Sequence, residues 1–161
     1  MSHYSNAQNP EELYRNAALQ VEGKLIPAYN DREDVRPVLC YRGMSGIASA
    51  TAVRLYLHLN YPSFTCGMLY VRKPNERSHG SAVEIEYPHG WSMYKKGCAR
   101  LEAVFVDDFI ASGSTLQFVY AAAQTGYPEI IWSRKAPALL LTSGYGDQPD
   151  SLANVSLPID W

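Results

Sequence analysis

Residues 104–115 decide the fold of this chain, and they read Val104-Phe105-Val106-Asp107-Asp108-Phe109-Ile110-Ala111-Ser112-Gly113-Ser114-Thr115. The run from Ala103 to Val106 is apolar without interruption, which is typical of a strand buried on both faces of a parallel sheet. Asp107 and Asp108 end that strand, and a short loop of hydroxyl residues and glycine follows. Apolar residues then recur at helical spacing until Gly126 and Pro128, which predicts a helix.

The loop between this strand and this helix has the composition of a phosphate-binding site. Backbone N–H groups at a helix start, with the hydroxyls of Ser112, Ser114 and Thr115, suit a phosphate dianion, and Gly113 permits close approach. The acid pair just before the loop is suited to vicinal hydroxyls or a hydrated cation. Phosphate and diol together indicate a ribose 5-phosphate.

Two common nucleotide-binding motifs are excluded by spacing. No Lys precedes Ser114 or Thr115, so the loop is not a P-loop, and the dinucleotide-binding Gly-x-Gly-x-x-Gly pattern is absent. The alternative without a ligand is an ordinary strand-to-helix turn in which Asp108 or Ser112 caps the helix.

Composition bounds the class of protein. The chain has 161 residues, 47% of them hydrophobic, which suits one domain, residues 1–161, with a sizeable core. A net charge of −2 and a pI near 6.1 argue against a nucleic-acid partner. Without a membrane-length apolar run or a signal-peptide core, and with three widely spaced cysteines, we expect no membrane partner and a cytoplasmic location.

The first sixty residues predict two helices around one strand. Asn9-Pro10-Glu11-Glu12 is a helix start, and the helix is expected to lie at the periphery and to end near Gly23, with residues 24–34 as a surface connection. Residues 38–41 form a short apolar strand, residues 42–46 a turn, and residues 47–59 a helix. The expected core face of that helix consists of Ala48, Ala52, Leu55 and Leu59.

Four further apolar segments predict strands, namely residues 63–71, 82–87, 129–132 and 138–141. Alternating strands and helices predict an α/β fold, a mostly parallel, Rossmann-like sheet flanked by helices, with ligand loops at the carboxyl ends of its strands. The core is expected to span about residues 35–142.

The segment 104–115 closely resembles the phosphoribosyl-pyrophosphate (PRPP) motif of type I phosphoribosyltransferases. The resemblance implies that Asp107 and Asp108 hold the ribose 2- and 3-hydroxyls. It also assigns pyrophosphate to the turn containing Arg42 and Gly43, because Tyr41-Arg42-Gly43-Met44 resembles the family's corresponding loop. The residues implied to hold the ribose and its 5-phosphate include Ile110, Ala111, Ser112, Gly113, Ser114 and Thr115.

A basic segment, residues 72–80, resembles the catalytic flap of the same family. Arg72-Lys73-Pro74 is similar to the opening of the adenine-enzyme loop, whereas the spacing of Arg77 and His79-Gly80 is closer to the orotate enzymes. The resemblance assigns Arg72 and Lys73 to pyrophosphate and makes Arg77 and His79 catalytic. Glu86-Tyr87 resembles a pair that is implicated in proton handling in the same family. The alternative interpretation of residues 72–80 is a solvated run of charges, and that of Glu86 is an edge-strand side chain that faces water.

The resemblance implies Mg²⁺-dependent transfer of the phosphoribosyl group from PRPP to a nucleobase, with a purine, adenine first, ahead of orotate. Mg²⁺ is expected to be held mainly through PRPP near Asp107 and Asp108, without a dedicated protein cage. A homodimer is also implied, as is a small hood from the N-terminal segment or the C-terminal tail. Alternatives are an orotate phosphoribosyltransferase-like enzyme, a non-catalytic PRPP- or nucleotide-binding regulator, and a structural protein that retains only the fold.

Overall fold

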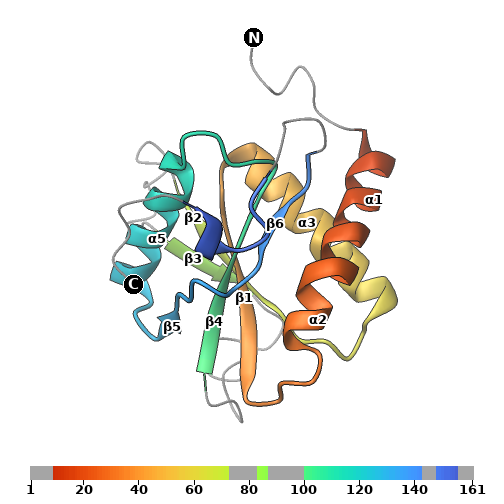
Figure 1. Ribbon diagram of the computed structural model, residues 1–161, viewed down its shortest axis with the longest axis horizontal. Helices are drawn as coiled ribbons and strands as arrows, with labels where there is room; N and C mark the ends of the chain where they lie inside the picture. The colour runs from red at the N-terminus through yellow and green to blue at the C-terminus, as the bar shows by residue number, and fades with distance from the viewer. Residues whose placement is uncertain (1–8, 73–82, 87–99, 143–147, 156–161) are drawn as a thin grey trace.

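The computed structural model describes residues 9–72, 83–86, 100–142 and 148–155, with residues 83–86 and 154 described in their backbone only. Its sheet has the strand order β3-β2-β1-β4-β5, and β6 also pairs with β4 (Figure 1). Among the described strands, β2 and β3 are the one antiparallel pair, so the predicted α/β fold with a mostly parallel sheet is confirmed. The strands are β1 (Val35–Arg42), β2 (Gly67–Val71), β3 (Val83–Glu86), β4 (Arg100–Asp107), β5 (Ile130–Ile131) and β6 (Ala138–Leu140).

Strand β4 is the centre of the sheet. Along one side it pairs with β1, with Val38 opposite Ala103 and Cys40 opposite Phe105. On its other side it pairs first with β5, at Leu101, and then with β6, at residues 105–107. The two short strands therefore occupy one sheet position in succession.

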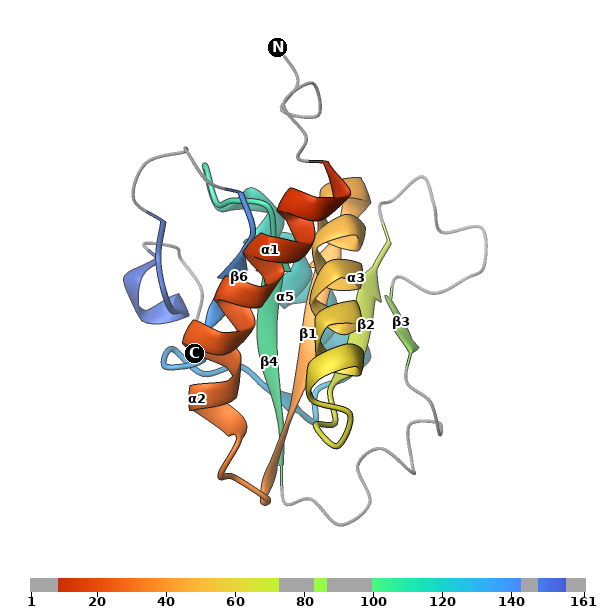
Figure 2. The ribbon, with the colours of Figure 1, turned by 90° about the vertical axis from the view of Figure 1, so that its right-hand side faces the viewer.

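Helices cover both faces of this sheet (Figure 2). Helix α5 (Ser114–Gly126) packs on one face, in a core that includes Ala103 and Phe105 of β4. Helices α1, α2 and α3 pack on the other face, in a core that includes Val104 and Val106. Because successive residues of a strand point to opposite faces, the uninterrupted apolar run of β4 supplies both cores, as predicted.

The N-terminal helical segment is longer and more deeply packed than predicted. Helix α1 (Pro10–Gln20), the π-helix η2 (Val21–Leu25) and α2 (Ile26–Tyr29) follow one another without a break. As predicted, Asn9 caps the start, where its Oδ1 accepts a hydrogen bond from the N–H of Glu12 at 2.9 Å. The predicted end at Gly23 and the surface connection from residue 24 are wrong, because Leu25 and Tyr29 continue the buried face.

Helix α3 (Gly43–Asn60) also differs from the prediction. It begins directly after β1, so residues 43–46 are its first turn rather than a separate loop. The predicted core face is wrong for Ala48, Leu55 and Leu59, which are exposed, while Ala52 is buried. The helix instead approaches the sheet through small residues, and a Cβ added at Gly46 would lie 3.3 Å from the Cβ of Tyr41. Close approach of backbone to sheet explains the choice of face.

Side chains of the N-terminal helical segment close the outer edge of β6. The Oε1 of Gln20 accepts from the N–H of Leu140 at 3.3 Å, and Lys24 Nζ donates to the carbonyl of Ala138 at 3.1 Å. Backbone groups that a further strand would bond are thus satisfied by side chains. In the described part of the chain, no helix combines the length and apolar character needed to cross a membrane.

Candidate functional site

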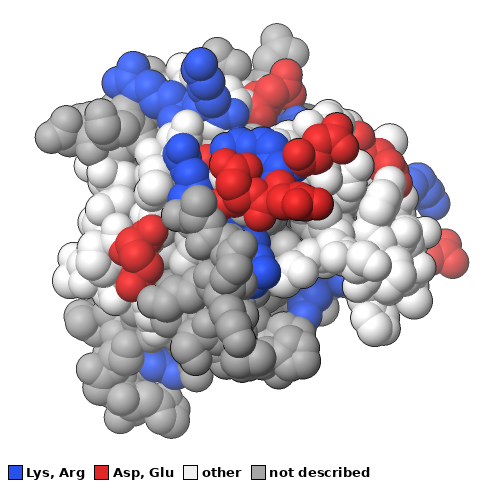
Figure 3. All heavy atoms as spheres, turned by 90° about the horizontal axis from the view of Figure 1, so that it is seen from below, with Lys and Arg blue, Asp and Glu red and all other residues white. Residues whose placement is uncertain are grey.

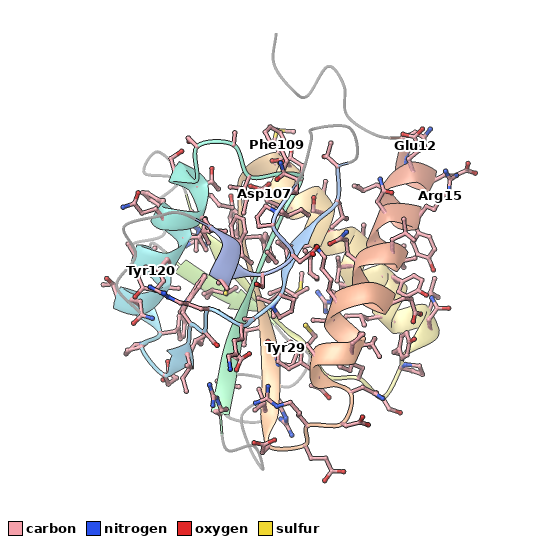
Figure 4. All side chains as sticks on the ribbon, in the orientation of Figure 1. Glu12, Arg15, Tyr29, Asp107, Phe109 and Tyr120 are labelled. Atoms are coloured by element: carbon pink, nitrogen blue, oxygen red, sulfur yellow. The ribbon has the colours of Figure 1, made fainter. Side chains whose placement is uncertain are left out.

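A cavity of about 330 Å³ lies at the carboxyl ends of β1 and β4. Two strand-to-helix connections form its walls, one from β1 into α3 and one from β4 into α5. Ten sequence-predicted residues line this cavity together: Arg42, Gly43, Asp107, Asp108, Ile110, Ala111, Ser112, Gly113, Ser114 and Thr115. Phe105, Phe109, Leu116 and Ser45 complete the lining, and Figure 4 marks the position of Asp107 and Phe109.

Gly113 sets the direction of the loop. It is the N-cap of α5 and has a φ of 84°, in the left-handed region that favours glycine. Its carbonyl accepts from Gln117 at 3.0 Å, which starts the helix. Ser112 Oγ accepts from the N–H of Ser114 at 3.3 Å and donates to Ser114 Oγ at 3.1 Å. Hydroxyls and the positive end of a helix dipole therefore meet at the cavity wall.

The acid pair is held rigidly. Asp107 is only 6% exposed, and its Oδ1 accepts from the N–H of Asp108 at 2.8 Å and from the hydroxyl of Ser45 at 3.2 Å. Asp108 Oδ1 accepts from the N–H of Phe109 at 2.9 Å. The carbonyls of the two acids accept from the N–H groups of Leu141 and Thr142 beyond β6. Both carboxylates are fixed before any ligand arrives, which lowers the entropic cost of binding.

Burial, together with the neighbouring carboxyl of Asp108, raises the pKa of Asp107 to about 8. The hydrogen bonds from the N–H of Asp108 and from Ser45 oppose this rise. Asp107 therefore favours its protonated form near neutral pH. A cation, or hydrogen-bond donors such as sugar hydroxyls, would favour the charged form and release that proton.

Arg42, the last residue of β1, adds a cation to the cavity lining. Its guanidinium carbon lies 3.8 Å from the centroid of the Phe118 ring on α5, a cation–π contact. Its Nε is buried and has no hydrogen-bond partner within the described residues. The stacked ring holds the planar group at the cavity, where Arg42 is suited to an oxyanion such as a phosphate.

Sequence reasoning missed two residues that hold this site together. Ser45 belongs to the segment read as a turn, and only the pairing of β1 beside β4 brings its hydroxyl to Asp107. Gln148 lies beyond the sheet, and its Oε1 accepts from the N–H of Ile110 at 2.8 Å. No local pattern marks Gln148, because its partner lies in another segment of the chain.

The remaining predicted site residues lie elsewhere or outside the described residues. Arg72 follows β2 and is buried, next to the position where Val71 pairs with Arg42. Lys73, Arg77 and His79 fall outside the described part of the chain. Glu86 lies on β3 opposite Met68, near the amino end of β2, whereas the cavity lies at the carboxyl ends of β1 and β4.

The cavity offers few metal ligands, which suits a metal ion that takes most of its ligands from water and substrate. Among the described residues, no three His, Cys, Asp or Glu side chains gather as a metal site. Asp107 and Asp108 supply two adjacent carboxyl groups. Mg²⁺ commonly binds through one or two carboxylates together with water and substrate phosphates, so this pair fits it.

A wider cavity of about 690 Å³ lies at the other end of the sheet, near the start of β1. Its lining combines Arg32 and Arg36 with Glu33 and aromatic rings, and Figure 3 shows acidic and basic side chains mixed on this side of the molecule. Ligands of open parallel sheets bind at the carboxyl ends of the strands. The smaller cavity is therefore the candidate site.

We expect opposite effects from the same substitution at two glycines. Gly113→Ala should destabilise the fold by about 1–2 kcal/mol, because a Cβ is strained at a left-handed φ. Gly23→Ala should stabilise it by about 0.5–1 kcal/mol, since Gly23 is helical and a Cβ there meets nothing within 4 Å. Urea unfolding measures both, and equal effects at the two positions would contradict the assigned backbone role of Gly113.

Comparisons with known proteins add a similarity of fold. No protein-family model and no curated protein matches this sequence. The fold is similar to a 1.9 Å crystal structure of orotate phosphoribosyltransferase from Francisella tularensis, with a TM-score of 0.47 and 16% sequence identity. The similarity covers 87% of this chain and 57% of that one, so this chain spans little more than half of the matched structure's length.

Proposed function

We propose that this protein transfers the 5-phosphoribosyl group from PRPP to a nucleobase, releasing pyrophosphate and giving a nucleoside monophosphate. One observation carries the proposal. A single cavity unites a stacked cation, Arg42, a fixed acid pair and a hydroxyl-lined loop at a helix start. These three features match three parts of PRPP, namely its pyrophosphate, its ribose hydroxyls and its 5-phosphate.

The loop residues would bind the 5-phosphate. Ser112, Ser114 and Thr115 offer hydroxyls beside the start of α5, where the helix dipole favours a dianion. Asp107 and Asp108 stand one step before the loop and would accept hydrogen bonds from the two ribose hydroxyls. The order along β4 and α5 thus follows the order of groups along a ribose 5-phosphate.

The proposed reaction requires the site to stabilise a leaving group. The anomeric C–O bond breaks, the sugar gains positive charge, and negative charge grows on pyrophosphate. Arg42 faces the cavity for this task, and Arg72, Lys73 and Arg77 are proposed, from their sequence pattern, to add further cations. Bound Mg²⁺ would supply additional positive charge beside the pyrophosphate. We propose that His79 takes the proton lost by the base, because Glu86 lies near the amino end of β2, away from the cavity.

A pyrophosphate-release assay tests the proposal. PRPP and Mg²⁺ are supplied with adenine, guanine, hypoxanthine, xanthine, orotate or uracil, each in a separate reaction. Release with a purine, adenine first, is the expected result and would also name the acceptor. Release with orotate alone would support the reaction and replace the purine assignment.

Calorimetry with PRPP and Mg²⁺ separates the remaining outcomes. Binding without release for any of the six bases would contradict the proposed catalysis and favour a PRPP-binding regulator. Neither binding nor release would contradict the assignment of the cavity itself.

A further inference from the structure

The guanidinium of Arg42 is held at the cavity by an aromatic ring, Phe118 of α5. Its carbon lies over the ring, 3.8 Å from the ring centroid. Arg42 ends β1, whereas Phe118 belongs to the helix that follows β4. The contact therefore joins the two strand-to-helix connections that form the cavity.

Strand and helix periodicity bring the two side chains together. Side chains of β1 alternate between the faces of the sheet, so Arg42 shares a face with Cys40, which belongs to the core under α5. On α5, Phe118 follows Ser114 by four residues and lies on the same side of the helix, one turn beyond the loop. The ring is partly buried against the same core, which fixes its position.

A ring contact leaves the hydrogen-bond donors of a guanidinium unused. The N–H groups lie in the plane of the guanidinium, and a ring covers only its face. A carboxylate partner has the opposite effect, as in the ion pair of Arg100 with Glu102 at 3.3 Å, where a donor is occupied and the charge is offset. The Nε of Arg42 is buried without a hydrogen-bond partner among the described residues, so Arg42 keeps both its charge and a donor for a ligand.

We propose that Phe118 is a positioning residue for Arg42 and thereby sets the affinity of the site for pyrophosphate. This inference rests on the proposed function, in which Arg42 binds the pyrophosphate group of PRPP. The ring restricts a long side chain before the ligand arrives, which lowers the entropic cost of binding. Phe118 does not belong to the described lining of the cavity, so it acts through Arg42.

Calorimetry with pyrophosphate and Mg²⁺ tests the role of the ring. Phe118→Leu keeps an apolar side chain but offers no aromatic face. It should raise the dissociation constant of pyrophosphate about threefold to tenfold, because one long side chain must then be ordered on binding. Phe118→Tyr restores the ring face and should bind pyrophosphate within about twofold of the wild type.

Tyr120→Leu is the matched control, because it removes another ring from the same helix. Tyr120 is partly buried, like Phe118, and its ring centroid lies 5.3 Å from that of Trp132. Figure 4 shows Tyr120 on α5, away from Asp107. Tyr120→Leu should lower stability in urea unfolding about as much as Phe118→Leu does, and it should leave pyrophosphate affinity unchanged.

Ribose 5-phosphate separates positioning of Arg42 from a general loss of structure. This ligand carries the groups proposed to bind the loop and the acid pair, but it has no pyrophosphate. Phe118→Leu should therefore leave its affinity within about twofold of the wild type, since Arg42 is not its proposed partner.

A double variant tests whether the ring acts through the cation. Arg42→Ala should weaken pyrophosphate binding by itself. Adding Phe118→Leu to Arg42→Ala should weaken it no further, because the ring then has no guanidinium to hold.

Four outcomes would overturn the role of Phe118 alone. They are unchanged pyrophosphate affinity in Phe118→Leu, an equal or larger loss for ribose 5-phosphate, an additive loss in the double variant, and a wild type that binds ribose 5-phosphate but not pyrophosphate. A wild type that binds neither ligand would instead contradict the proposed function, and the role of Phe118 would fall with it.

Discussion

The double variant Asp107→Asn/Asp108→Asn should bind PRPP on the order of 100-fold more weakly, or not at all, while keeping its fold. Hydrogen bonds to charged groups are worth about 1.5–3 kcal/mol each, and the variant removes both carboxylates that would accept from the ribose hydroxyls. The amide oxygen of Asn can still accept from Ser45 and from the N–H of residue 108, so the loop should remain in place. Isothermal titration calorimetry in the presence of Mg²⁺ measures the loss.

The control for this variant is Asp31→Asn/Asp34→Asn, which makes the same two substitutions at exposed residues before β1. It should bind PRPP like the wild type. Unchanged PRPP affinity in the Asp107→Asn/Asp108→Asn variant would contradict the proposal that these two residues bind the ribose hydroxyls.

The acid-pair variant should also alter the pH dependence of stability. The pKa of Asp107 rises from 3.8 to about 8 on folding, so between these values the folded state binds one more proton than the unfolded state. The free energy of unfolding therefore falls as pH rises from about 4 to about 8, and this contribution levels off above that. An Asn side chain does not titrate, so in Asp107→Asn the melting temperature should depend less on pH between about 4 and about 8.

The affinity of the wild type for PRPP should rise steeply as pH increases from 6 toward 8. Ligands that need charged Asp107 must displace its proton, so each pH unit below the pKa of about 8 lowers the apparent affinity up to about tenfold. Calorimetry in two buffers of different ionisation enthalpy counts the protons released. A release close to one proton per bound PRPP at pH 7 is the expected result.

Ser45→Ala separates this effect from ionisation of PRPP itself. The hydroxyl of Ser45 lowers the pKa of Asp107, so its removal should move the pH profile of binding to higher pH. PRPP titrates identically with both proteins. A profile that does not move, or an affinity that does not depend on pH, would contradict proton release from Asp107.

Several features of the fold and the site could be predicted because they depend on neighbouring residues. The run 103–106 had to be a doubly buried strand, since its residues alternate between two cores and all are apolar. The sequence predicts that Gly113 lets the backbone approach a phosphate closely, and its φ of 84° gives a second reason for a glycine at this position. The acid pair, the loop and α5 follow directly in the chain, so their relation is local.

Other features could not be predicted, because each depends on contacts with residues that are distant in the sequence. The start of α3 at Gly43 depends on that residue's φ of 73°, which a turn would have allowed equally. The π-helix η2 continues the N-terminal helix because Leu25 and Tyr29 find an apolar sheet face beneath them. Gln148 reaches Ile110 from a distant segment, and no periodicity encodes such a contact.

By itself the sequence determined the strand, acid pair, phosphate-sized loop and helix of residues 103–126, because local backbone preference and hydrophobic burial act on adjacent residues. Only the tertiary structure decided that β1 lies beside β4, which brings Arg42 and Ser45 to the acid pair. It also decided which side of α3 packs on the sheet. Both sides carry apolar residues, and close packing selects the one with small residues, leaving large side chains such as Met44 and Leu59 exposed.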